Sequence, residues 1–459
     1  MTATPPAPRP APPPAPRPAS DPASDPGPRS PSTALLTDHY ELTMLQAALA
    51  SGEADRRCVF EAFSRRLPDG RRYGVVGGTG RLLEALESFR FGEDELAFLA
   101  EREVVNQTTL DYLADYRFTG DITGYAEGEV YFPQSPVLLV ESSFAEGVLL
   151  ETLILSILNH DTAIVSAASR MTCAAGERPC IEMGSRRTHE ESAVAAARAA
   201  YIAGFAATSN LEAGRRYGVP TTGTAAHAFT LLYDSEREAF TAQVNSLGKG
   251  TTLLVDTFDV RAAVDLALEI AGPQLGAVRL DSGDLLIQAQ EVRAQLDAAG
   301  NRDTRIIVTS DLDEHAIAAL AAGPVSGYGV GTALVTGSGA PTASMVYKLV
   351  QREGSSGEME DVAKESKDKK TMGGRKWAMR RLSDAGIAQA EIVGIGEPPT
   401  SDGNDRPLMV ELVRRGEVVD HQDIARARAR HAASRAELPR AATQLSRGEP
   451  VIPTVFVEA

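Results

Sequence analysis

Residues 277–299 read AVRLDSGDLLIQAQEVRAQLDAA, a short apolar strand followed by a polar turn and an amphipathic helix. The same pattern recurs from about Thr162 to Thr332, at intervals of roughly 20 to 35 residues. Repeated units of this kind build a parallel sheet covered by helices, and seven or eight strands would close it into a βα barrel. We expect strands at residues 163–166, 180–184, 206–208, 219–223, 252–256, 277–281, 305–309 and 326–330.

The segments on either side of this repeat differ from it in composition. Residues 1–32 are rich in Pro and Ala, which cannot bury a core, so we expect a disordered tail there. Residues 33–160 combine helical and strand-like runs, and residues 341–459 hold strand-like runs joined by charged loops. We therefore expect a βα-barrel catalytic domain over residues 161–340 and an additional α+β domain built from the N- and C-terminal segments.

A basic, glycine-hinged stretch interrupts the acidic C-terminal segment at residues 364–376. Such a stretch is either a solvated loop or a loop that closes over a polyphosphate. The sequence favours the solvated loop and leaves the second interpretation open.

The composition limits the classes of function. Of 459 residues, 62 are acidic and 46 basic, and the formal net charge of −16 opposes binding to nucleic acid or to anionic lipid. No stretch approaches the roughly 18 to 20 unbroken apolar residues of a membrane span. The three cysteines lack a Cys-x-x-Cys spacing, so we expect neither a disulfide framework nor a zinc site. These limits favour a cytoplasmic protein whose anionic substrates would need local basic pockets.

Polar residues follow the predicted strands, at the end where catalytic groups collect in a βα barrel. The arginines there offer planar cations for carboxylates or phosphates, with a structural ion pair as the alternative for each. They are Arg170, Arg187 and Arg279. The aspartates there offer carboxylates for sugar hydroxyls or Mg²⁺. They are Asp256, Asp281 and Asp284.

Two compact glycine turns open helices after late strands. Gly283 lies in the turn DSGD at residues 281–284, and Gly331 with Thr332 forms the second turn. Backbone N–H groups of such turns bind a phosphate monoester, and phosphate sites recur at the last strands of βα barrels. We therefore predict two phosphate-binding turns, with simple helix capping as the alternative.

A histidine, His227, follows the Gly/Thr-rich residues 218–226 just beyond a predicted strand. Its imidazole can act as an acid or base, as a metal ligand, or as a nucleophile that carries a phosphoryl group. Metal ligation is disfavoured because no second histidine lies close by in the sequence. The small neighbours of His227 provide little apolar wall, which favours a functional role. We expect His160 in a polar turn that enters the barrel.

Five motifs occur together in an order that resembles the nicotinate phosphoribosyltransferases, and the match runs from about Leu35 to Val350. The motifs are LTDHYELTM at residues 36–44, EMGSRR at 182–187, GTAAH at 223–227, VRLDSGD at 278–284 and GVGT at 329–332. The resemblance implies a barrel of the type II phosphoribosyltransferase kind.

The resemblance also implies a reaction and its participants. Nicotinate would attack the anomeric carbon of phosphoribosyl pyrophosphate, which gives nicotinate mononucleotide and diphosphate. ATP, as co-substrate, would drive the transfer through a phosphohistidine, and Mg²⁺ would neutralise the leaving diphosphate. A homodimer with its active site at the subunit interface is implied, because Tyr40 belongs in this family to a subunit that faces the neighbouring barrel.

Roles for individual residues follow from the same resemblance. The catalytic residues would be His227, Arg279 and Asp281, and His227 would be the one modified by phosphorylation. Arg279 and Tyr40 would contact nicotinate, with Thr224 beside them. The 5′-phosphate would be held by Ser282, Gly283, Asp284, Gly331 and Thr332. Arg170 and Arg187 match basic positions of the active site, and Asp256 or Asp281 would lie near the ribose.

Two alternatives stay open. The same fold also acts on nicotinamide or quinolinate, although the histidine motif and a lone carboxylate opposite Arg279 favour nicotinate. A catalytically inactive protein that binds a nucleotide and regulates a partner should have lost a residue at a strand end, and none is evidently missing.

Overall fold

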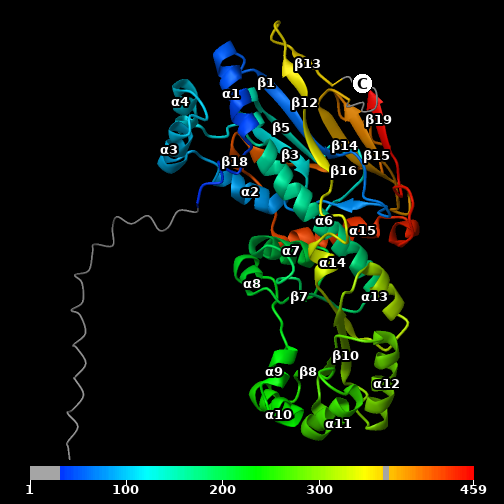
Figure 1. Ribbon diagram of the computed structural model, residues 1–459. Helices are drawn as coiled ribbons and strands as arrows, with labels where there is room; N and C mark the ends of the chain where they lie inside the picture. The colour runs from blue at the N-terminus through cyan, green and yellow to red at the C-terminus, as the bar shows by residue number, and fades with distance from the viewer. Residues whose placement is uncertain (1–30, 365–371, 459) are drawn as a thin grey trace, which may run out of the picture.

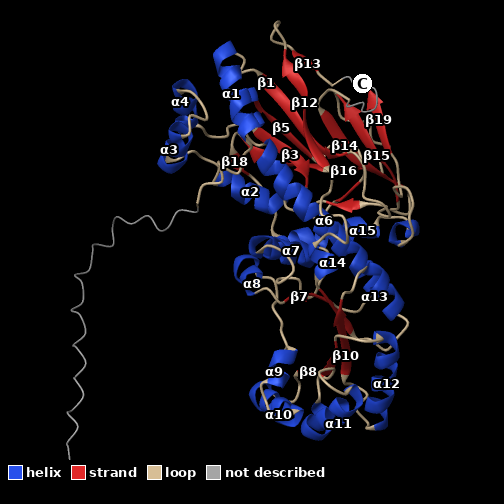
Figure 2. Ribbon diagram, viewed as in Figure 1, coloured by secondary structure: helices blue, strands red, loops and turns tan. Residues whose placement is uncertain are grey.

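Two bodies lie one above the other in the computed structural model, which describes residues 31–364 and 372–458 (Figure 1). Figure 2 shows strands concentrated in one body and a sheet surrounded by helices in the other. The predicted tail lies outside the described residues except for its last two positions, and so does most of the basic stretch 364–376. Among the described residues, no helix combines the length and the apolar character that crossing a bilayer requires.

The strands of the first body, called the antiparallel body below, pair antiparallel except for the last strand of the chain, which pairs parallel with its neighbour. Its strands are β1 (Arg57–Ser64), β2 (Gly74–Val75), β3 (Asp121–Tyr125), β4 (Val130–Tyr131), β5 (Leu138–Ser143), β12 (Met345–Glu353), β13 (Met359–Asp361), β14 (Lys376–Leu382), β15 (Ala388–Ile395), β16 (Arg406–Pro407), β17 (Met409–Arg414), β18 (Glu417–Val418) and β19 (Thr454–Glu458). Its helices are α1 (His39–Ser51), α2 (Thr79–Glu87), α3 (Glu93–Glu101), α4 (Gln107–Asp115), α5 (Phe144–Val148) and α15 (Ile424–Ala436).

Both ends of the chain contribute strands to this body. The seven-stranded sheet has the order β13-β12-β1-β5-β3-β17-β18, and a four-stranded sheet has the order β16-β14-β15-β19. β1 pairs antiparallel with both β5 and β12. It contains Val59, Phe60 and Phe63, residue types that suit a buried pleated surface, and Phe60 stacks on Tyr347 of β12 with ring centroids 5.0 Å apart.

The second body is a parallel sheet with helices around it. Its strands are β6 (Cys180–Glu182), β7 (Ala207–Thr208), β8 (Thr252–Leu254), β9 (Ala277–Leu280), β10 (Arg305–Ser310) and β11 (Gly327–Val330). Its helices are α7 (Glu190–Ile202), α8 (Leu211–Tyr217), α9 (His227–Leu231), α10 (Glu236–Leu247), α11 (Val260–Ala271), α12 (Leu285–Ala298), α13 (Glu314–Leu320) and α14 (Thr332–Val335). The predicted fold class is thus confirmed.

The parallel sheet is a half barrel. Its order is β7-β6-β11-β10-β9-β8, with every neighbouring pair parallel. The prediction of a strand at residues 219–223 is wrong. These residues form only an isolated parallel bridge, between Thr221 and Thr208. The chain instead runs from α8 to α9 as an extended segment along one side (Figure 1).

The strand expected at residues 163–166 is also wrong, because these residues lie inside the long helix α6 (Glu151–Ala175). This helix lies between the two bodies (Figure 1), and its residues 161–171 are all buried. A helix that is buried on all sides has no polar face to reveal its period in the sequence. His160 lies in the same helix rather than in a turn, with Nδ1 2.8 Å from Oδ1 of Asp161.

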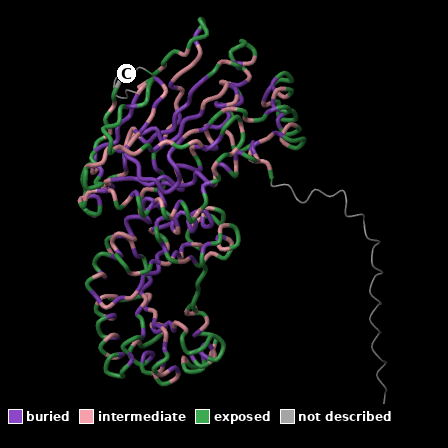
Figure 3. The backbone as a smooth tube through the Cα atoms, turned by 180° about the vertical axis from the view of Figure 1, so that it is seen from behind, coloured by how far each residue is buried: buried purple, intermediate pink, exposed green. Residues whose placement is uncertain are grey.

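One hydrophobic core continues from the antiparallel body through α6 to the parallel sheet. Phe132 of the first body and Val308 of β10 belong to the same cluster of buried side chains. Figure 3 shows the buried backbone concentrated in the antiparallel body and at the junction of the two bodies. The half barrel is therefore packed against the first body rather than tethered to it.

The helix α15 contributes polar contacts to this junction. Its Arg428 donates to the carbonyl oxygen of Phe205, beyond the end of α7, at 2.8 Å. His431 is 2% exposed, and its Nε2 lies 2.8 Å from Oγ of Ser169 in α6. Burial, with a smaller contribution from Arg435, lowers the pKa of His431 to about 3.

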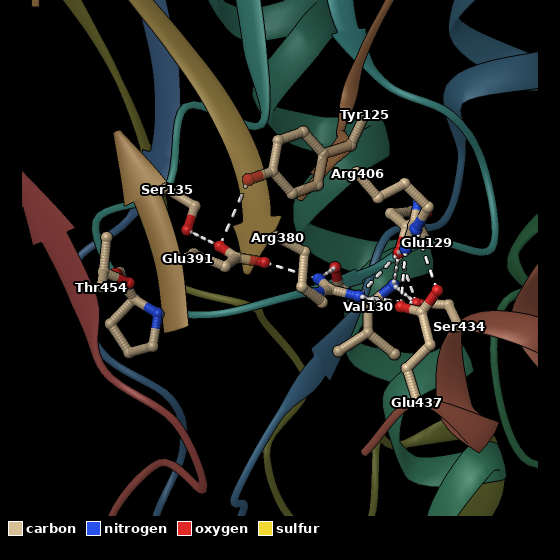
Figure 4. Close-up of polar contacts among 11 residues, drawn as sticks. Tyr125, Glu129, Val130, Ser135, Arg380, Glu391, Arg406, Ser434, Glu437 and Thr454 are labelled. Atoms are coloured by element: carbon tan, nitrogen blue, oxygen red, sulfur yellow. Dashed lines mark hydrogen bonds and ion pairs between the residues drawn. The ribbon is translucent and has the colours of Figure 1, made fainter. Parts of the chain in front are cut away.

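A buried ion-pair network joins the four-stranded sheet to the segment before β4 and to the C-terminal end of α15 (Figure 4). Its centre is the fully buried Arg380 of β14, whose Nη2 lies 2.6 Å from Oε1 of Glu391 and whose Nη1 lies 3.0 Å from Oε1 of Glu129. Arg406 forms a second ion pair with Glu129, at 2.9 Å. These buried charges are paired, although Nε of Arg380 has no hydrogen-bond partner among the described residues.

Candidate active site

A cavity of about 400 Å³ opens at the carboxyl ends of the parallel strands. Seven of the residues that the sequence singled out line it: Arg187, Thr224, His227, Arg279, Asp281, Gly331 and Thr332. They come from β9, from the segments that follow β6, β9 and β11, and from the start of α9 with the segment that leads into it. The half barrel therefore brings together at one site residues that are more than a hundred positions apart in the sequence.

His227 lies beside the carboxylate of Asp256. Its Nε2 is 3.2 Å from Oδ1 of Asp256, whose side chain is 2% exposed, whereas the histidine side chain is 39% exposed. Asp256 follows β8 and His227 is the first residue of α9. When Nε2–H donates to the carboxylate, Nδ1 is the nitrogen that keeps a free lone pair.

The second oxygen of Asp256 reaches the first predicted phosphate turn. Oδ2 accepts a hydrogen bond from the backbone N–H of Asp281 at 3.0 Å and one from the hydroxyl of Ser282 at 2.7 Å. A single buried carboxylate therefore connects the histidine with the turn at residues 281–284.

The first turn has the backbone that its glycine permits. Gly283 has a φ of +85°, in the left-handed region that side chains disfavour. Asp281 lines the cavity and accepts a hydrogen bond from the hydroxyl of Thr309. Ser282, Gly283 and Asp284 lie beyond the lining, and Asp284 caps α12 by accepting from the N–H of Ile287 at 3.2 Å.

Arg279 presents a guanidinium group that is incompletely hydrogen-bonded. Its Nη1 donates to Oγ1 of Thr224 at 2.5 Å, while its buried Nε has no partner within residues 31–364 and 372–458. Burial lowers the pKa of Arg279, whereas Asp281 and Asp256 raise it and Arg186 lowers it. Buried donors of a cation are normally paired, so this group is suited to an anionic ligand.

Arg170 does not line this cavity, and its predicted substrate-binding role stays a prediction. Its side chain in α6 is 7% exposed, and Nε lies 3.0 Å from Oε1 of Glu314. Nη1 donates to the carbonyl oxygen of Gly70 at 2.6 Å. Arg170 forms the structural ion pair that was the alternative interpretation, because a buried arginine is stable only with such partners.

Tyr40 does not reach the cavity within one chain. It lies on α1, and Figure 1 shows α1 and α9 at opposite ends of the molecule. The tyrosine is 45% exposed. Partial burial, with a contribution from Glu151, raises the pKa of its hydroxyl to about 12.

Some lining residues at the predicted strand ends were given no individual role from the sequence. They are Met183, Arg186, Ser209, Ser310 and Asp311. Met183 lies within the strand expected at residues 180–184, and the other four follow predicted strands within two positions, where catalytic groups collect. Arg186 matters most for charge, because it adds a third cation to Arg187 and Arg279.

Comparisons with known proteins agree with this geometry. Residues 35–159 match the model of the nicotinate phosphoribosyltransferase N-terminal domain. The chain is 58% identical to the nicotinate phosphoribosyltransferase pncB1 of Mycobacterium tuberculosis over 434 residues, covering 93% of this chain and 95% of the relative.

Two solved structures share the fold. The human nicotinic acid phosphoribosyltransferase has a TM-score of 0.79 and 25% identity, covering 92% of this chain and 97% of that one. The nicotinate-nucleotide pyrophosphorylase of Pyrococcus furiosus has a TM-score of 0.73 and 23% identity, covering 88% and 95%. The extent of the relationship to pncB1, together with the cavity just described, shows that this chain belongs to the nicotinate phosphoribosyltransferase family.

Proposed function

We propose that this chain transfers the phosphoribosyl group of phosphoribosyl pyrophosphate to nicotinate, and that ATP hydrolysis is coupled to the transfer through His227. The ring nitrogen of nicotinate forms a bond to the anomeric carbon, and the bond from that carbon to diphosphate breaks. The products are nicotinate mononucleotide and diphosphate. The hydrogen bond between His227 and Asp256 is the observation that carries the proposal.

That hydrogen bond supports a nucleophilic role for the free ring nitrogen. Nδ1 of His227 would take the γ-phosphoryl group of ATP and release ADP, while Asp256 stabilises the positive charge of the ring. Asp256 also binds the turn at residues 281–284. A new charge on His227 would therefore change the electrostatic potential at this turn, where the 5′-phosphate is proposed to lie.

Arg279 is proposed to bind the nicotinate carboxylate. Its guanidinium is a planar fork of donors, with Nη1 beside Thr224 and with an unpartnered Nε, and such a fork suits a carboxylate better than an amide. The transfer itself requires positioning and charge placement rather than a protein nucleophile, because the anomeric carbon develops positive charge as diphosphate leaves.

Mg²⁺ is proposed to arrive with the phosphates of the substrates. Asp281 and Asp311 line the cavity and supply oxygen ligands of the kind that Mg²⁺ prefers. Across the described part of the chain, however, no group of three or more His, Cys, Asp or Glu side chains is placed to hold a metal. The ion would therefore share its coordination between a carboxylate, water and diphosphate, and would neutralise the leaving group.

We also propose a homodimer in which Tyr40 of a second copy completes the site. Large apolar side chains are exposed beside the cavity-lining loops: Leu231 is 62%, Leu232 75% and Phe258 65% exposed. An apolar rim of this kind is typical of a protein interface. A cytoplasmic location is proposed as well, since all three cysteines are free.

The purified protein, given Mg²⁺, phosphoribosyl pyrophosphate and nicotinate, should make nicotinate mononucleotide faster with ATP than without it. His227→Ala should remove the stimulation by ATP. It should also remove the acid-labile phosphoryl group that ATP transfers to the wild-type protein. Equal or better turnover of nicotinamide would overturn the substrate assignment, and ATP stimulation that survives His227→Ala would overturn the coupling.

A further inference from the structure

Glu182 is a buried carboxyl group at the end of β6 that the proposed reaction does not use. It is fully buried, and none of the ion pairs found among the described residues includes it. Burial raises its pKa, and hydrogen bonds from Thr208 and Gly184 oppose that rise. A carboxyl group buried without a cation is unfavourable for stability, so a methionine of similar volume would pack at lower cost.

The two oxygens of Glu182 bind two different loops. Oε1 accepts a hydrogen bond from the backbone N–H of Gly184, and Oε2 accepts one from the hydroxyl of Thr208. The hydroxyl of Thr208 in turn accepts from the N–H of Asn210 at 2.9 Å. Every member of this short chain of hydrogen bonds is therefore satisfied.

Both loops form walls of the cavity. The loop at residues 184–187 carries Arg186 and Arg187, and the residue after Thr208 is Ser209; all three line the cavity. The two loops also contact each other directly, since Nδ2 of Asn210 donates to Oγ of Ser185 at 3.1 Å. The hydrogen bonds of Glu182 thus fix the first residues of both loops, and one of these loops presents Arg186 and Arg187 to the ligand.

The first loop is also packed against the second phosphate turn. A Cβ atom added at Gly184 would lie 2.3 Å from Cγ1 of Val335 and 3.1 Å from the carbonyl oxygen of Gly331. Little room is left for the loop to shift without moving the turn at Gly331. A change at Glu182 would therefore displace several ligand-facing groups together.

We propose that Glu182 is a positioning residue, which fixes the loops at residues 184–187 and 208–210 so that Arg186, Arg187 and Ser209 meet the substrates. The inference rests on the proposed function for the identity of those substrates. Glu182 itself does not line the cavity, so it acts through these residues rather than on the reacting atoms.

The test compares Glu182→Met, which removes both acceptors at similar volume, with Glu182→Gln, which keeps one. Glu182→Met should raise the KM for nicotinate or for phosphoribosyl pyrophosphate about tenfold or more, with kcat changed less, because misplaced binding groups cost affinity. Glu182→Gln should show only a small part of that increase in KM. Thr208→Val should raise the KM by a smaller factor. In the Glu182→Met background it should cause no further increase, because both changes break the same contact.

Thr304→Val is the matched control, since Thr304 is a buried threonine at the opposite end of the same sheet, where its hydroxyl donates to the carbonyl oxygen of Leu275 at 2.9 Å. It should leave both KM values unchanged. Unchanged KM values in Glu182→Met, or equal losses in the Met and Gln variants, would overturn the inference. Binding of phosphoribosyl pyrophosphate, measured by calorimetry, needs no turnover, so it tests Glu182 even if wild-type protein fails to make nicotinate mononucleotide.

Discussion

His227 and Asp256 are 29 residues apart in the sequence, yet their side chains meet at 3.2 Å across the mouth of the half barrel. The contact connects the segment before α9 with the end of β8, and through Asp256 it reaches the turn at residues 281–284. A charge placed on the histidine can thus alter the turn without any movement of the sheet.

Asp256→Asn should therefore uncouple ATP hydrolysis from phosphoribosyl transfer. The amide keeps the shape but not the charge that favours a positively charged imidazole, so the rate of phosphohistidine formation should fall about 100-fold. Incorporation of the γ-phosphoryl group into protein checks this. Asp259→Asn is the control, because Asp259 caps α11 by accepting from the N–H of Ala262 and asparagine caps equally well. Equal phosphorylation of the two variants would contradict the role of Asp256.

The dimer proposal predicts complementation between two inactive variants. Tyr40→Ala and Arg279→Ala should each be nearly inactive, while a randomly mixed dimer population should regain about a quarter of wild-type activity, since half the dimers carry one intact site. A steady-state assay after co-expression measures it.

Arg279→Ala mixed with Asp281→Ala should stay inactive, because every barrel in the mixture carries one of the two changes. A Tyr40/Arg279 mixture that is no more active than its parents would show that Tyr40 does not serve a neighbouring barrel.

Arg380→Met should destabilise the protein far more than Arg414→Met. The first leaves Glu391 buried without its cation and leaves Glu129 with Arg406 alone, a loss of about 3–5 kcal/mol in the free energy of unfolding. The side chain of Arg414 is 63% exposed and pairs with Glu411, which is 36% exposed, so the expected loss there is below about 1 kcal/mol. Urea unfolding of both variants checks this, and similar losses would contradict the structural importance of the network.

His431 should make the protein less stable in mild acid. Its folded pKa of about 3 lies below the ordinary value of 6.5, so its contribution is complete above about pH 6.5 and is lost as the pH falls toward 3. The free energy of unfolding should fall by up to about 1.4 kcal/mol per pH unit in that window.

Unfolding at pH 7.5 and pH 5.5 measures this slope. His431→Gln should flatten it, and His189→Gln, which changes a side chain that is 67% exposed, should not. A slope that is unchanged in His431→Gln would assign the acid sensitivity to other groups.

The sequence predicted the elements whose pattern is local. Residues 277–299 form β9, a polar turn and α12 as expected, because a strand and an amphipathic helix each show their own period. Residues 163–166 could not be recognised as helical, since the contacts that bury them on all sides come from segments far away in the chain.

Site residues divide in the same way. The glycine turns and His227 were found because their chemistry is visible in a short motif. The partner of Arg170 is Glu314, 144 positions away, and nothing near Arg170 in the sequence indicates an ion pair there. Glu182 had a visible signal, an acidic residue at the end of an apolar strand, but its hydrogen bonds to Gly184 and Thr208 appear only once the loops are folded.

The pairing of β1 with β12 sets an order for synthesis on the ribosome. Residues 57–64 emerge long before residues 345–353, which complete one side of β1, whereas all the strands of the half barrel emerge in between. The half barrel can thus fold before the last strands of the seven-stranded sheet, β12, β13, β17 and β18, have been synthesised. Because such distant pairing is slow, premature termination after α14 would release a chain with an exposed strand edge, the kind of surface on which aggregation begins.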